Sequence, residues 1–187
     1  MKLMIASDIH GSALYCGETL EAFRREKADR LLLLGDLLYH GPRNELPEVY
    51  APKEVAAMLN GVADSLLCVR GNCDAEVDQM VLSFPILAEY CVLYAGGRML
   101  LAAHGHHIGD DLPRLRAGDI LLCGHTHVAG RIERDGVLFA NPGSVSLPKE
   151  NTPRGYIILD DDCLTWKTLD GGIYDEYPLN GGTRTAP

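Results

Sequence analysis

The amino-acid sequence predicts an α/β fold in which a parallel sheet is followed by a strand-rich half. Between residues 2 and 70, short apolar runs alternate with helical patterns in the order strand, helix, strand, helix, strand, which is typical of βαβ units. After Pro85 the strands follow one another through short turns, which indicates a partly antiparallel second sheet packed on the first.

Glycines and prolines mark the elements of the first half. Residues 2–6 form an apolar strand, and apolar side chains recur among charged ones over 14–25, as in an amphipathic helix. The leucines at 31–34 form the continuous apolar run expected of a buried parallel strand. Prolines and a glycine indicate a loop over 40–52, and a helix over 52–62 and a third strand over 65–70 follow it.

In the second half we expect strands over 90–94, 98–103, 119–123, 130–134, 137–140 and 156–169. Gly96-Gly97 and Asp135-Gly136 have the chemistry of tight hairpin turns. We interpret the acidic run 160–162 as a solvated hairpin turn. The sequence shows neither a linker nor an internal repeat, so we expect one domain over residues 1–179 and a disordered tail over 180–187.

Composition narrows the classes of function. The chain has 187 residues and a formal net charge of −9, which disfavours an extended nucleic-acid surface or an anionic membrane as partner. The first apolar run is too short for a signal peptide or a membrane span. The six cysteines are scattered without a C-x-x-C pair, so we expect a reducing, cytoplasmic compartment.

Five apolar runs each finish with a carboxylate, amide or imidazole side chain beside a glycine. The segments are Asp8-Ile9-His10, Gly35-Asp36, Gly71-Asn72-Cys73-Asp74, His104-Gly105-His106 and Gly124-His125-Thr126-His127. In open α/β sheets, binding sites lie outside the carboxyl ends of the strands. We therefore expect these side chains to converge in space although they are far apart in the sequence.

The chemistry of these side chains points to divalent metal ions. A mixture of imidazole, carboxylate and amide ligands suits Mn²⁺, Fe²⁺, Co²⁺, Ni²⁺ or Zn²⁺, and the cysteine spacing excludes a structural zinc site. Seven donors are too many for one tetrahedral ion but fit two ions that share a ligand. Two such ions can hold a bridging hydroxide and polarise a phosphoryl oxygen.

The motif series, in order from residue 8 to residue 127, resembles that of the calcineurin-like metallophosphoesterase superfamily. The resemblance implies a four-layer αββα sandwich, in which two mixed β-sheets are flanked by helices. It also implies that Asp8, His10 and His127 hold one metal ion. Asn72, His104 and His125 would hold the other, and Asp36 would bridge them.

Three further segments resemble the small YfcE-type phosphodiesterases of bacteria and archaea: His40-Gly41-Pro42-Arg43-Asn44, Arg70-Gly71-Asn72-Cys73-Asp74 and Asn141-Pro142-Gly143-Ser144. This resemblance implies a cytoplasmic enzyme with two divalent ions per chain, Mn²⁺ first among them. It also implies that the enzyme hydrolyses a small phosphodiester with a metal-bridging hydroxide. The catalytic residues would be Asp36, Asn72 and His104.

Cys73 departs from the superfamily pattern, in which this position is usually the histidine that protonates the leaving group. A thiol is a poor substitute for that acid, and general acid catalysis contributes about 10²–10⁴-fold. We therefore expect aryl esters, whose leaving oxygen needs little protonation, to be the better substrates. Cys73 is interpreted as a small residue that supports the site, because the metal-bound hydroxide already provides the nucleophile.

Further residues are candidates for binding the substrate. Arg43 can clamp phosphate through its guanidinium, although a solvated loop arginine is the competing interpretation. His40 and Asn72 would contact the substrate. His106 is either an alternative proton donor or a supporting residue. Asp74 is expected to support a ligand, since metal-bound imidazoles usually donate their second N–H to a carboxylate or a carbonyl.

Two alternatives to a phosphodiesterase stay open. The first is a phosphomonoesterase that acts on nucleotides or phosphoproteins, against which the missing histidine at position 73 argues. The second is a non-catalytic metal-binding scaffold, although such relatives tend to lose ligands that this chain keeps. The apolar character of residues 84–94 also hints at a homo-oligomer.

Overall fold

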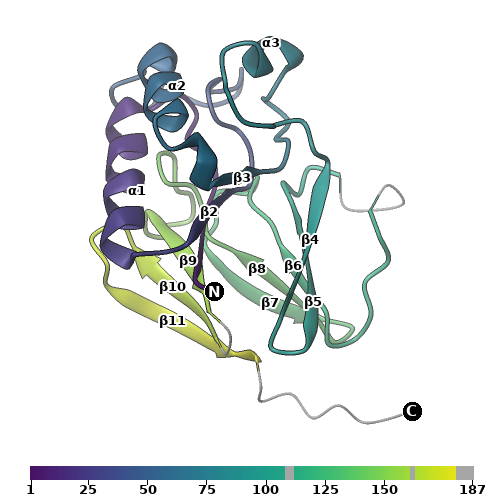
Figure 1. Cartoon of the computed structure of the whole chain (residues 1–187). Coiled ribbons are helices and arrows are strands. Elements are labelled where there is room, and N and C mark those ends of the chain that lie inside the picture. Colours follow the sequence, from purple (N-terminus) through teal and green to yellow (C-terminus); the bar gives the residue numbers. More distant parts are fainter. Residues whose placement is uncertain (108–111, 161–162, 180–187) are drawn as a thin grey trace.

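The computed structural model describes residues 1–107, 112–160 and 163–179. Two mixed β-sheets face each other, and the longer helices lie against the first sheet (Figure 1). The expected disordered tail over 180–187 and two residues of the acidic turn, 161–162, lie outside the described residues. The prediction of two mixed sheets with flanking helices is confirmed.

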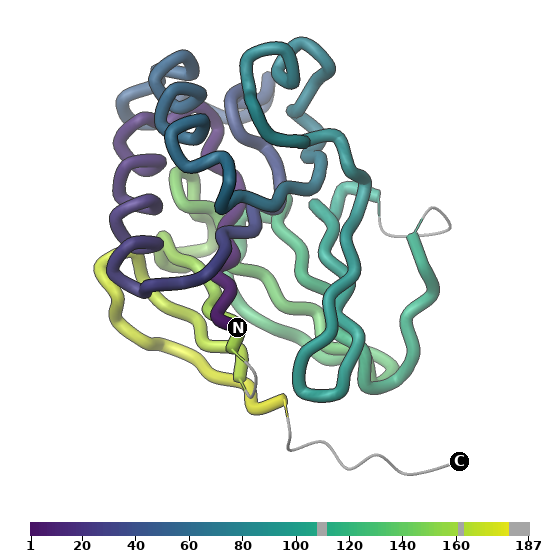
Figure 2. The backbone as a smooth tube through the Cα atoms, in the orientation of Figure 1, coloured from purple at the N-terminus to yellow at the C-terminus, as the bar shows by residue number. Residues whose placement is uncertain are grey.

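The first sheet has six strands in the order β11-β10-β9-β1-β2-β3. Their bounds are β1 Leu3–Ala6, β2 Arg30–Leu33, β3 Leu66–Cys68, β9 Gly155–Leu159, β10 Cys163–Thr168 and β11 Ile173–Pro178. The three N-terminal strands are parallel, and β9, β10 and β11 extend the sheet antiparallel from β1. In Figure 2 the N-terminal strand β1 lies in the same sheet as the C-terminal strands, and it pairs with β9.

The second sheet has five strands in the order β4-β5-β6-β8-β7. Their bounds are β4 Tyr90–Ala95, β5 Arg98–Ala103, β6 Ile120–Leu122, β7 Gly130–Arg134 and β8 Val137–Asn141. The central strands β5, β6 and β8 are parallel, whereas the outer strands β4 and β7 pair antiparallel through hairpins. Both sheets therefore direct the carboxyl ends of parallel strands to one end of the sandwich (Figure 1).

The helices are α1 Ala13–Glu26, α2 Pro52–Asn60 and the short α3 Glu76–Gln79, with a single 3₁₀ turn, η1, over Ala63–Ser65. Helix α1 begins after Ser12, whose hydroxyl accepts the N–H of Tyr15, as in an N-cap. It ends where Lys27 adopts a left-handed conformation. Helix α2 begins at Pro52. Proline suits this position because the first backbone nitrogen of a helix makes no intrahelical hydrogen bond.

The alternation of side chains along each strand separates two buried layers. Met4 and Leu33 face α1 and α2, whereas Leu3, Leu32 and their neighbours face the second sheet. Burial on both faces explains why the leucine run of β2 has no polar alternation. Leu112 and Leu115, which are not helical, pack on the outer face of the second sheet.

Strands β9 and β10 cover most of 156–169 and pair antiparallel, in keeping with the hairpin turn expected at the acidic run. The sequence reasoning missed β11 and α3, because neither has a strong apolar period. Within 84–94, Phe84 and Ile86 are buried in the core, and the large hydrophobic side chains that are exposed are Tyr90, Val92 and Tyr94 of β4. The exposed apolar surface is therefore an edge strand and not the whole segment.

Candidate metal centre

The seven candidate ligands meet where parallel strands of both sheets end. They follow β1, β2 and β3 of the first sheet and β5 and β6 of the second: Asp8, His10, Asp36, Asn72, His104, His125 and His127. Two sets of three among these side chains, Asp8-His10-His127 and Asp8-Asp36-His104, each have donor atoms that all lie within 4.8 Å of one another. The predicted convergence of distant residues is thus present in the structure.

Asp8, His10 and His127 form the first group of donors, and all three are buried. Oδ1 of Asp8 lies 3.5 Å from Nε2 of His10 and 3.3 Å from Nε2 of His127. The two Nε2 atoms are 3.1 Å apart. Three donor atoms therefore face one another across a single small volume.

Asn72, His104 and His125 form the second group. Oδ1 of Asn72 lies 3.0 Å from Nε2 of His104 and 2.7 Å from Nδ1 of His125. His104 is buried, but Asn72 is exposed and His125 is half-buried. The second group is therefore the side of the centre that is open to solvent.

Asp36 lies between the two groups. Its Oδ2 atom is 3.6 Å from Nε2 of His10 in the first group and 3.4 Å from Nε2 of His104 in the second. Its Oδ1 atom accepts the backbone N–H of Cys73 at 2.8 Å. One carboxylate oxygen is thus held by the backbone while the other faces both groups.

Backbone carbonyls orient three of the imidazole rings. The pairs are His10 Nδ1 with Tyr39 O at 2.8 Å, His104 Nδ1 with Leu34 O at 2.6 Å and His127 Nδ1 with Leu147 O at 2.8 Å. A carbonyl only accepts, so each Nδ1 carries a proton, and in the neutral ring each Nε2 keeps a lone pair for a metal ion. This is the arrangement that metal-bound histidines adopt.

Two observations test whether these residues fit a metal ion. Oδ1 of Asp8 is fully buried and has no hydrogen-bond partner among the described residues. The Nε2 lone pairs of His10 and His127 point at the same volume as this oxygen. A bound cation would satisfy these buried acceptor atoms, which have no hydrogen-bond donor between them. The residues therefore fit a divalent metal ion that prefers nitrogen and oxygen ligands.

Backbone strain is concentrated at the same residues. Asp8, His10, Asp36, His125 and His127 all have φ between 49° and 64°, in the left-handed region that side chains usually avoid. Each such conformation costs about 1 kcal/mol or more. The surrounding fold therefore holds five of the seven candidate ligands in sparsely populated conformations, as is common at functional sites.

Glycines beside the ligands allow the loops to approach closely. A Cβ atom on Gly71 would lie 2.1 Å from Oδ1 of Asp36, and one on Gly124 would lie 2.0 Å from the hydroxyl of Ser7. Neither position can accommodate a side chain. The repeated glycines in the motifs thus have a packing reason, which is the close contact between ligand-bearing loops.

The electrostatics favour ionised carboxylates. Burial acts to raise the pKa of Asp8, but contacts with His10 and His127 hold it well below its usual value. Burial also acts to raise the pKa of Asp36, yet His104 lowers it. Burial acts to lower the pKa of His104, but contact with Asp36 and the charge of Asp8 raise it to about 9. The centre thus holds negative charge that attracts cations.

A cavity of about 420 Å³ opens onto the centre. Among its lining residues are the ligands Asp36, Asn72, His125 and His127, and also Cys73, Arg43 and Lys149. Arg43 thus lies where the sequence predicted a phosphate clamp. Lys149 adds a second positive charge that the sequence analysis missed, because a lysine in a loop without a motif gives no signal.

His40 and His106 lie beside the cavity and not in its lining. The ring of His40 packs edge-on against Tyr39 and Tyr50, with centroid distances of 4.8 and 5.3 Å. His106 has its ring centroid 5.4 Å from that of His104. Burial and nearby histidines lower the pKa of His106 to about 4.

For His40, contact with a substrate would require the ring to leave its aromatic neighbours Tyr39 and Tyr50.

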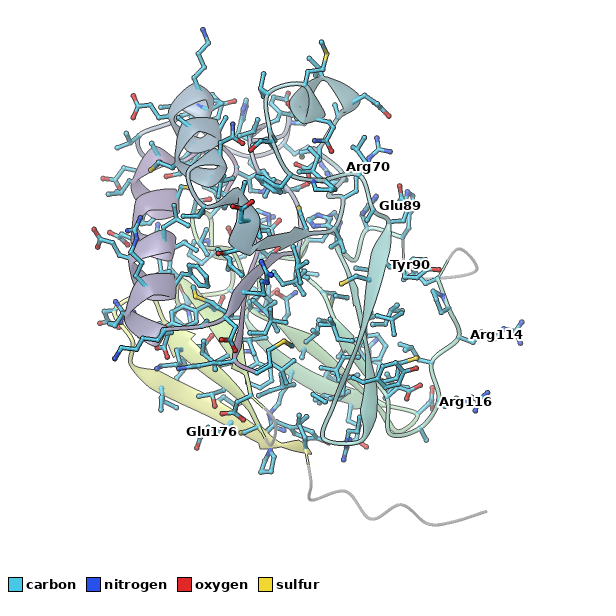
Figure 3. The ribbon with its side chains drawn as sticks, in the orientation of Figure 1. Arg70, Glu89, Tyr90, Arg114, Arg116 and Glu176 are labelled. Carbon is cyan, nitrogen blue, oxygen red and sulfur yellow. The ribbon has the colours of Figure 1, made fainter. Side chains whose placement is uncertain are left out.

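A side cavity of about 350 Å³ lies next to Asn72 and is lined also by Arg70, Glu89 and His106. Arg70 and Glu89 form an ion pair with an N–O distance of 3.6 Å, and Figure 3 shows them close together near the start of β4. The guanidinium of Arg70 is thus already engaged by a carboxylate. Arg43 and Lys149 are the cations that line the main cavity.

Asp74 contacts the backbone of the candidate ligand Asp36 and not an imidazole. Its carboxylate accepts the backbone N–H groups of Asp36, Leu37 and Gly71 at 2.7–2.9 Å. It therefore joins the loops after β2 and β3 and does not hold an imidazole. Cys73 is half-buried, and burial followed by the charge of Asp36 raises the pKa of its thiol to about 12. Such a thiol keeps its proton at neutral pH.

The end of β8 and the segment after it support the ligand loops. The Asn141 amide donates to the carbonyl of Gly124 at 2.8 Å, and the hydroxyl of Ser144 donates to the carbonyl of Asp8 at 2.8 Å. Ser146 makes a further bond to the same carbonyl at 2.9 Å. These side chains hold the strained loops without facing the metal centre.

Comparison with known proteins bears on these features. Residues 1–162 match the calcineurin-like phosphoesterase superfamily domain. The chain is 49% identical to phosphodiesterase YfcE of Escherichia coli (strain K12) over 182 residues, which are 96% of this chain and 99% of that protein. It is 29% identical to the probable metallophosphoesterase YsnB of Bacillus subtilis (strain 168), over 91% of each chain.

Solved structures give the same result for the fold. The structure of YfcE, described as a phosphoesterase from E. coli, superposes with a TM-score of 0.89 at 47% identity and covers 96% of this chain and 100% of its own. Vps29 of Entamoeba histolytica, complexed with zinc, has a TM-score of 0.60 at 21% identity over 96% and 100%, which shows likeness of fold alone. The chain belongs to the calcineurin-like phosphoesterase superfamily.

Proposed function

We propose that this chain is a divalent-metal-dependent phosphodiesterase. The observation that carries the proposal is the position of Asp36, whose Oδ2 atom faces imidazoles of both donor groups at 3.6 and 3.4 Å. A shared carboxylate between two donor groups suits two adjacent ions. The superfamily match and the 49% identity to phosphodiesterase YfcE support the same activity.

Asp8, His10 and His127 would hold one ion, and Asn72, His104 and His125 the other, with Asp36 shared. When bound, the two ions would supply a bridging hydroxide as nucleophile and would polarise the phosphoryl oxygen. We take Mn²⁺ as the first candidate, with Fe²⁺, Ni²⁺, Co²⁺ and Zn²⁺ as alternatives, because the mixed nitrogen and oxygen donors accept all of them.

The chain's own side chains position the substrate. Asn72 is the exposed ligand at the cavity, so its amide also meets the incoming phosphate. Arg43 and Lys149 line the same cavity and supply positive charge for the phosphoryl oxygens. His40 and His106 are substrate contacts only if their rings move. The catalytic assignments remain Asp36, Asn72 and His104.

The residue at position 73 favours diesters with good leaving groups. A cysteine there supplies no efficient acid for a leaving alkoxide, whereas an aryl oxide leaves without one. The alternative activity, a phosphomonoesterase, would need another proton donor, and His106 beside His104 is the candidate. A non-catalytic metal-binding scaffold is the weaker alternative, because all seven donors are present and converge.

The substrate would be a small phosphodiester, since the cavity has no extended basic stripe. A cytoplasmic location is supported by the six free cysteines. None of the helices in the described ranges is long and apolar enough to cross a membrane. The exposed β4 side chains support a homo-oligomer, and the core shared between the two sheets supports one domain over 1–179.

The test is steady-state hydrolysis of bis-p-nitrophenyl phosphate against p-nitrophenyl phosphate, with chelator-stripped protein refilled with Mn²⁺. Metal-dependent cleavage that favours the diester supports the proposal. Faster cleavage of the monoester would select the phosphomonoesterase. No cleavage of either substrate by protein with two bound ions would select the scaffold.

A further inference from the structure

A second and larger cavity, of about 680 Å³, lies between α2 and α3. Much of its lining is apolar and comes from α2, from α3 with its flanking residues and from the loop after β2: Leu38, Tyr39, Tyr50, Ala57, Val77 and Val81. We refer to this hollow as the apolar cavity. Its volume falls within the range of about 300–1,000 Å³ that small-molecule sites occupy.

The apolar cavity adjoins the cavity at the metal centre. Cys73 lines both of them, so its small side chain lies at the boundary between the two. Tyr39 connects them in another way, because its carbonyl orients the imidazole of His10 while its side chain lines the apolar cavity. A molecule held at the metal centre can therefore extend past Cys73 towards α2 and α3.

The lining exposes apolar surface to water without an evident structural reason. Val77, Val81 and Tyr39 are 64%, 55% and 42% exposed. Burying such surface under a ligand is favourable in proportion to the area covered. The lining also has one lysine and one aspartate, Lys53 and Asp78, whose opposite charges give no net attraction for a second phosphate. Its chemistry suits an uncharged, hydrophobic group.

A phosphodiester carries two organic substituents on one phosphate. With the phosphate at the metal centre, one substituent must leave the small catalytic cavity, and the adjoining apolar cavity offers it space. We propose that the apolar cavity binds a hydrophobic substituent, aryl or alkyl, of the phosphodiester. This inference rests on the proposed function, to which it adds the class of the substrate.

The test uses phosphonates that cannot be hydrolysed, as inhibitors of methyl p-nitrophenyl phosphate cleavage by the Mn²⁺-loaded protein. Methylphosphonate occupies the metal centre alone, whereas octylphosphonate and benzylphosphonate also carry an alkyl or an aryl group. We expect at least one of octylphosphonate and benzylphosphonate to have an inhibition constant at least tenfold lower than that of methylphosphonate. The comparison of octyl with benzyl distinguishes an alkyl from an aryl preference.

Variants assign the effect to the cavity. Val81→Asp places a charge in the lining and should reduce the ratio of methyl to octyl inhibition constants about tenfold. Ile132→Asp is the control, because Ile132 is an exposed aliphatic residue on β7 of the other sheet, and its ratio should equal that of the unmodified protein. Calorimetric titration with octylphosphonate should show the same difference in binding without depending on turnover.

The outcomes separate this inference from the proposed function. If methyl p-nitrophenyl phosphate is not cleaved at all, the proposed function fails. If it is cleaved but the inhibition constants do not depend on the substituent, the inference about the apolar cavity is overturned and the function stands. Equal inhibition ratios for Val81→Asp and the unmodified protein would also overturn it.

Discussion

The backbone N–H of Cys73 donates a 2.8 Å hydrogen bond to Oδ1 of Asp36. This bond turns Oδ2 of Asp36 towards His10 and His104, which belong to different donor groups. The contact uses the main chain of residue 73 and not its thiol. This bond does not need a side chain at position 73, although the thiol of Cys73 also contacts the Asp36 carboxylate.

Replacement of Asp36 should remove metal binding and turnover together. Asp36→Asn keeps the volume of the side chain but removes the negative charge that both donor groups share. Residues that only support a ligand cost about 10–100-fold in metal affinity or activity, so a shared ligand should cost more. The measurement is metal content per chain after dialysis, together with diester turnover.

The control for this substitution is Asp64→Asn, at an exposed aspartate in η1. It should keep both metal content and turnover. A protein with Asp36→Asn that binds two ions and cleaves the diester at the original rate would contradict the assignment of Asp36.

Replacement of Cys73 should have a small effect on aryl diesters. In Cys73→Ala the backbone bond to Asp36 remains, so we expect a loss of kcat well below the about 100-fold that removal of a general acid causes. Cys73→His should instead raise the activity towards esters with poor, alkyl leaving groups. Rates for one aryl and one alkyl ester, measured with metal content, check both expectations. Loss of all turnover in Cys73→Ala with intact metal content would mean that the thiol takes part in the reaction.

The contacts of Glu26, which is remote from the metal centre, predict that the stability of the fold depends on pH. Its side chain is only 7% exposed and contacts Lys2, Lys167 and Tyr156. The contacts with Tyr156 and Lys167 join α1 to β9 and β10. Burial acts to raise the pKa of Glu26, but the contacts led by Lys167 lower it to about 2. A lowered folded-state pKa stabilises the protein above the unfolded-state value of about 4.3. This stabilisation is lost as the pH falls towards 2.

Glu26→Gln should therefore lower the free energy of unfolding at pH 7 by about 1–3 kcal/mol, because charged partners lose their counter-charge in a buried position. The difference from the unmodified protein should shrink between pH 4.3 and about 2. Urea denaturation at several pH values measures it. Glu21→Gln, at an exposed position of the same helix, is the control and should change little. A difference that does not vary with pH would show that Glu26 acts through shape alone.

The sequence was sufficient for features that depend on local pattern. The leucines of β2 are buried on both faces, and Asp8, Asp36 and His104 lie shortly after the ends of their strands. The order of these motifs was also sufficient to predict the superfamily and, with it, the class of phosphoric ester hydrolases. The match of the superfamily domain over residues 1–162 confirms this prediction. The geometry of parallel strands then implies convergence without knowledge of any contact.

Features that depend on long-range contacts could not be predicted. Asp74 stands in a motif, but its bonds to backbone groups of the loop after β2 depend on how two loops meet. Lys149 reaches the cavity only because the segment after β8 folds back on the ligand loops. Strand β11 has mixed exposure along its length, so its sequence has no clear period. In each case the determining partner is distant in the sequence.

Metal removal should destabilise the fold as well as stop turnover. The strained residues, among them Asp8, Asp36 and His127, surround acceptor atoms that a cation would satisfy, and the unfolded chain has no such site. An ion present at about 100 times its dissociation constant adds about 2.7 kcal/mol to the free energy of unfolding. For a chain of this size, that corresponds to a Tm increase of about 5–10 °C. Thermal unfolding in Mn²⁺ and in excess chelator measures the increase. Glu26→Gln should lower both Tm values and keep the difference between them, whereas Asp36→Asn should remove the difference. If the unmodified protein has the same Tm with Mn²⁺ and with chelator, the seven residues do not form a metal site in the folded chain.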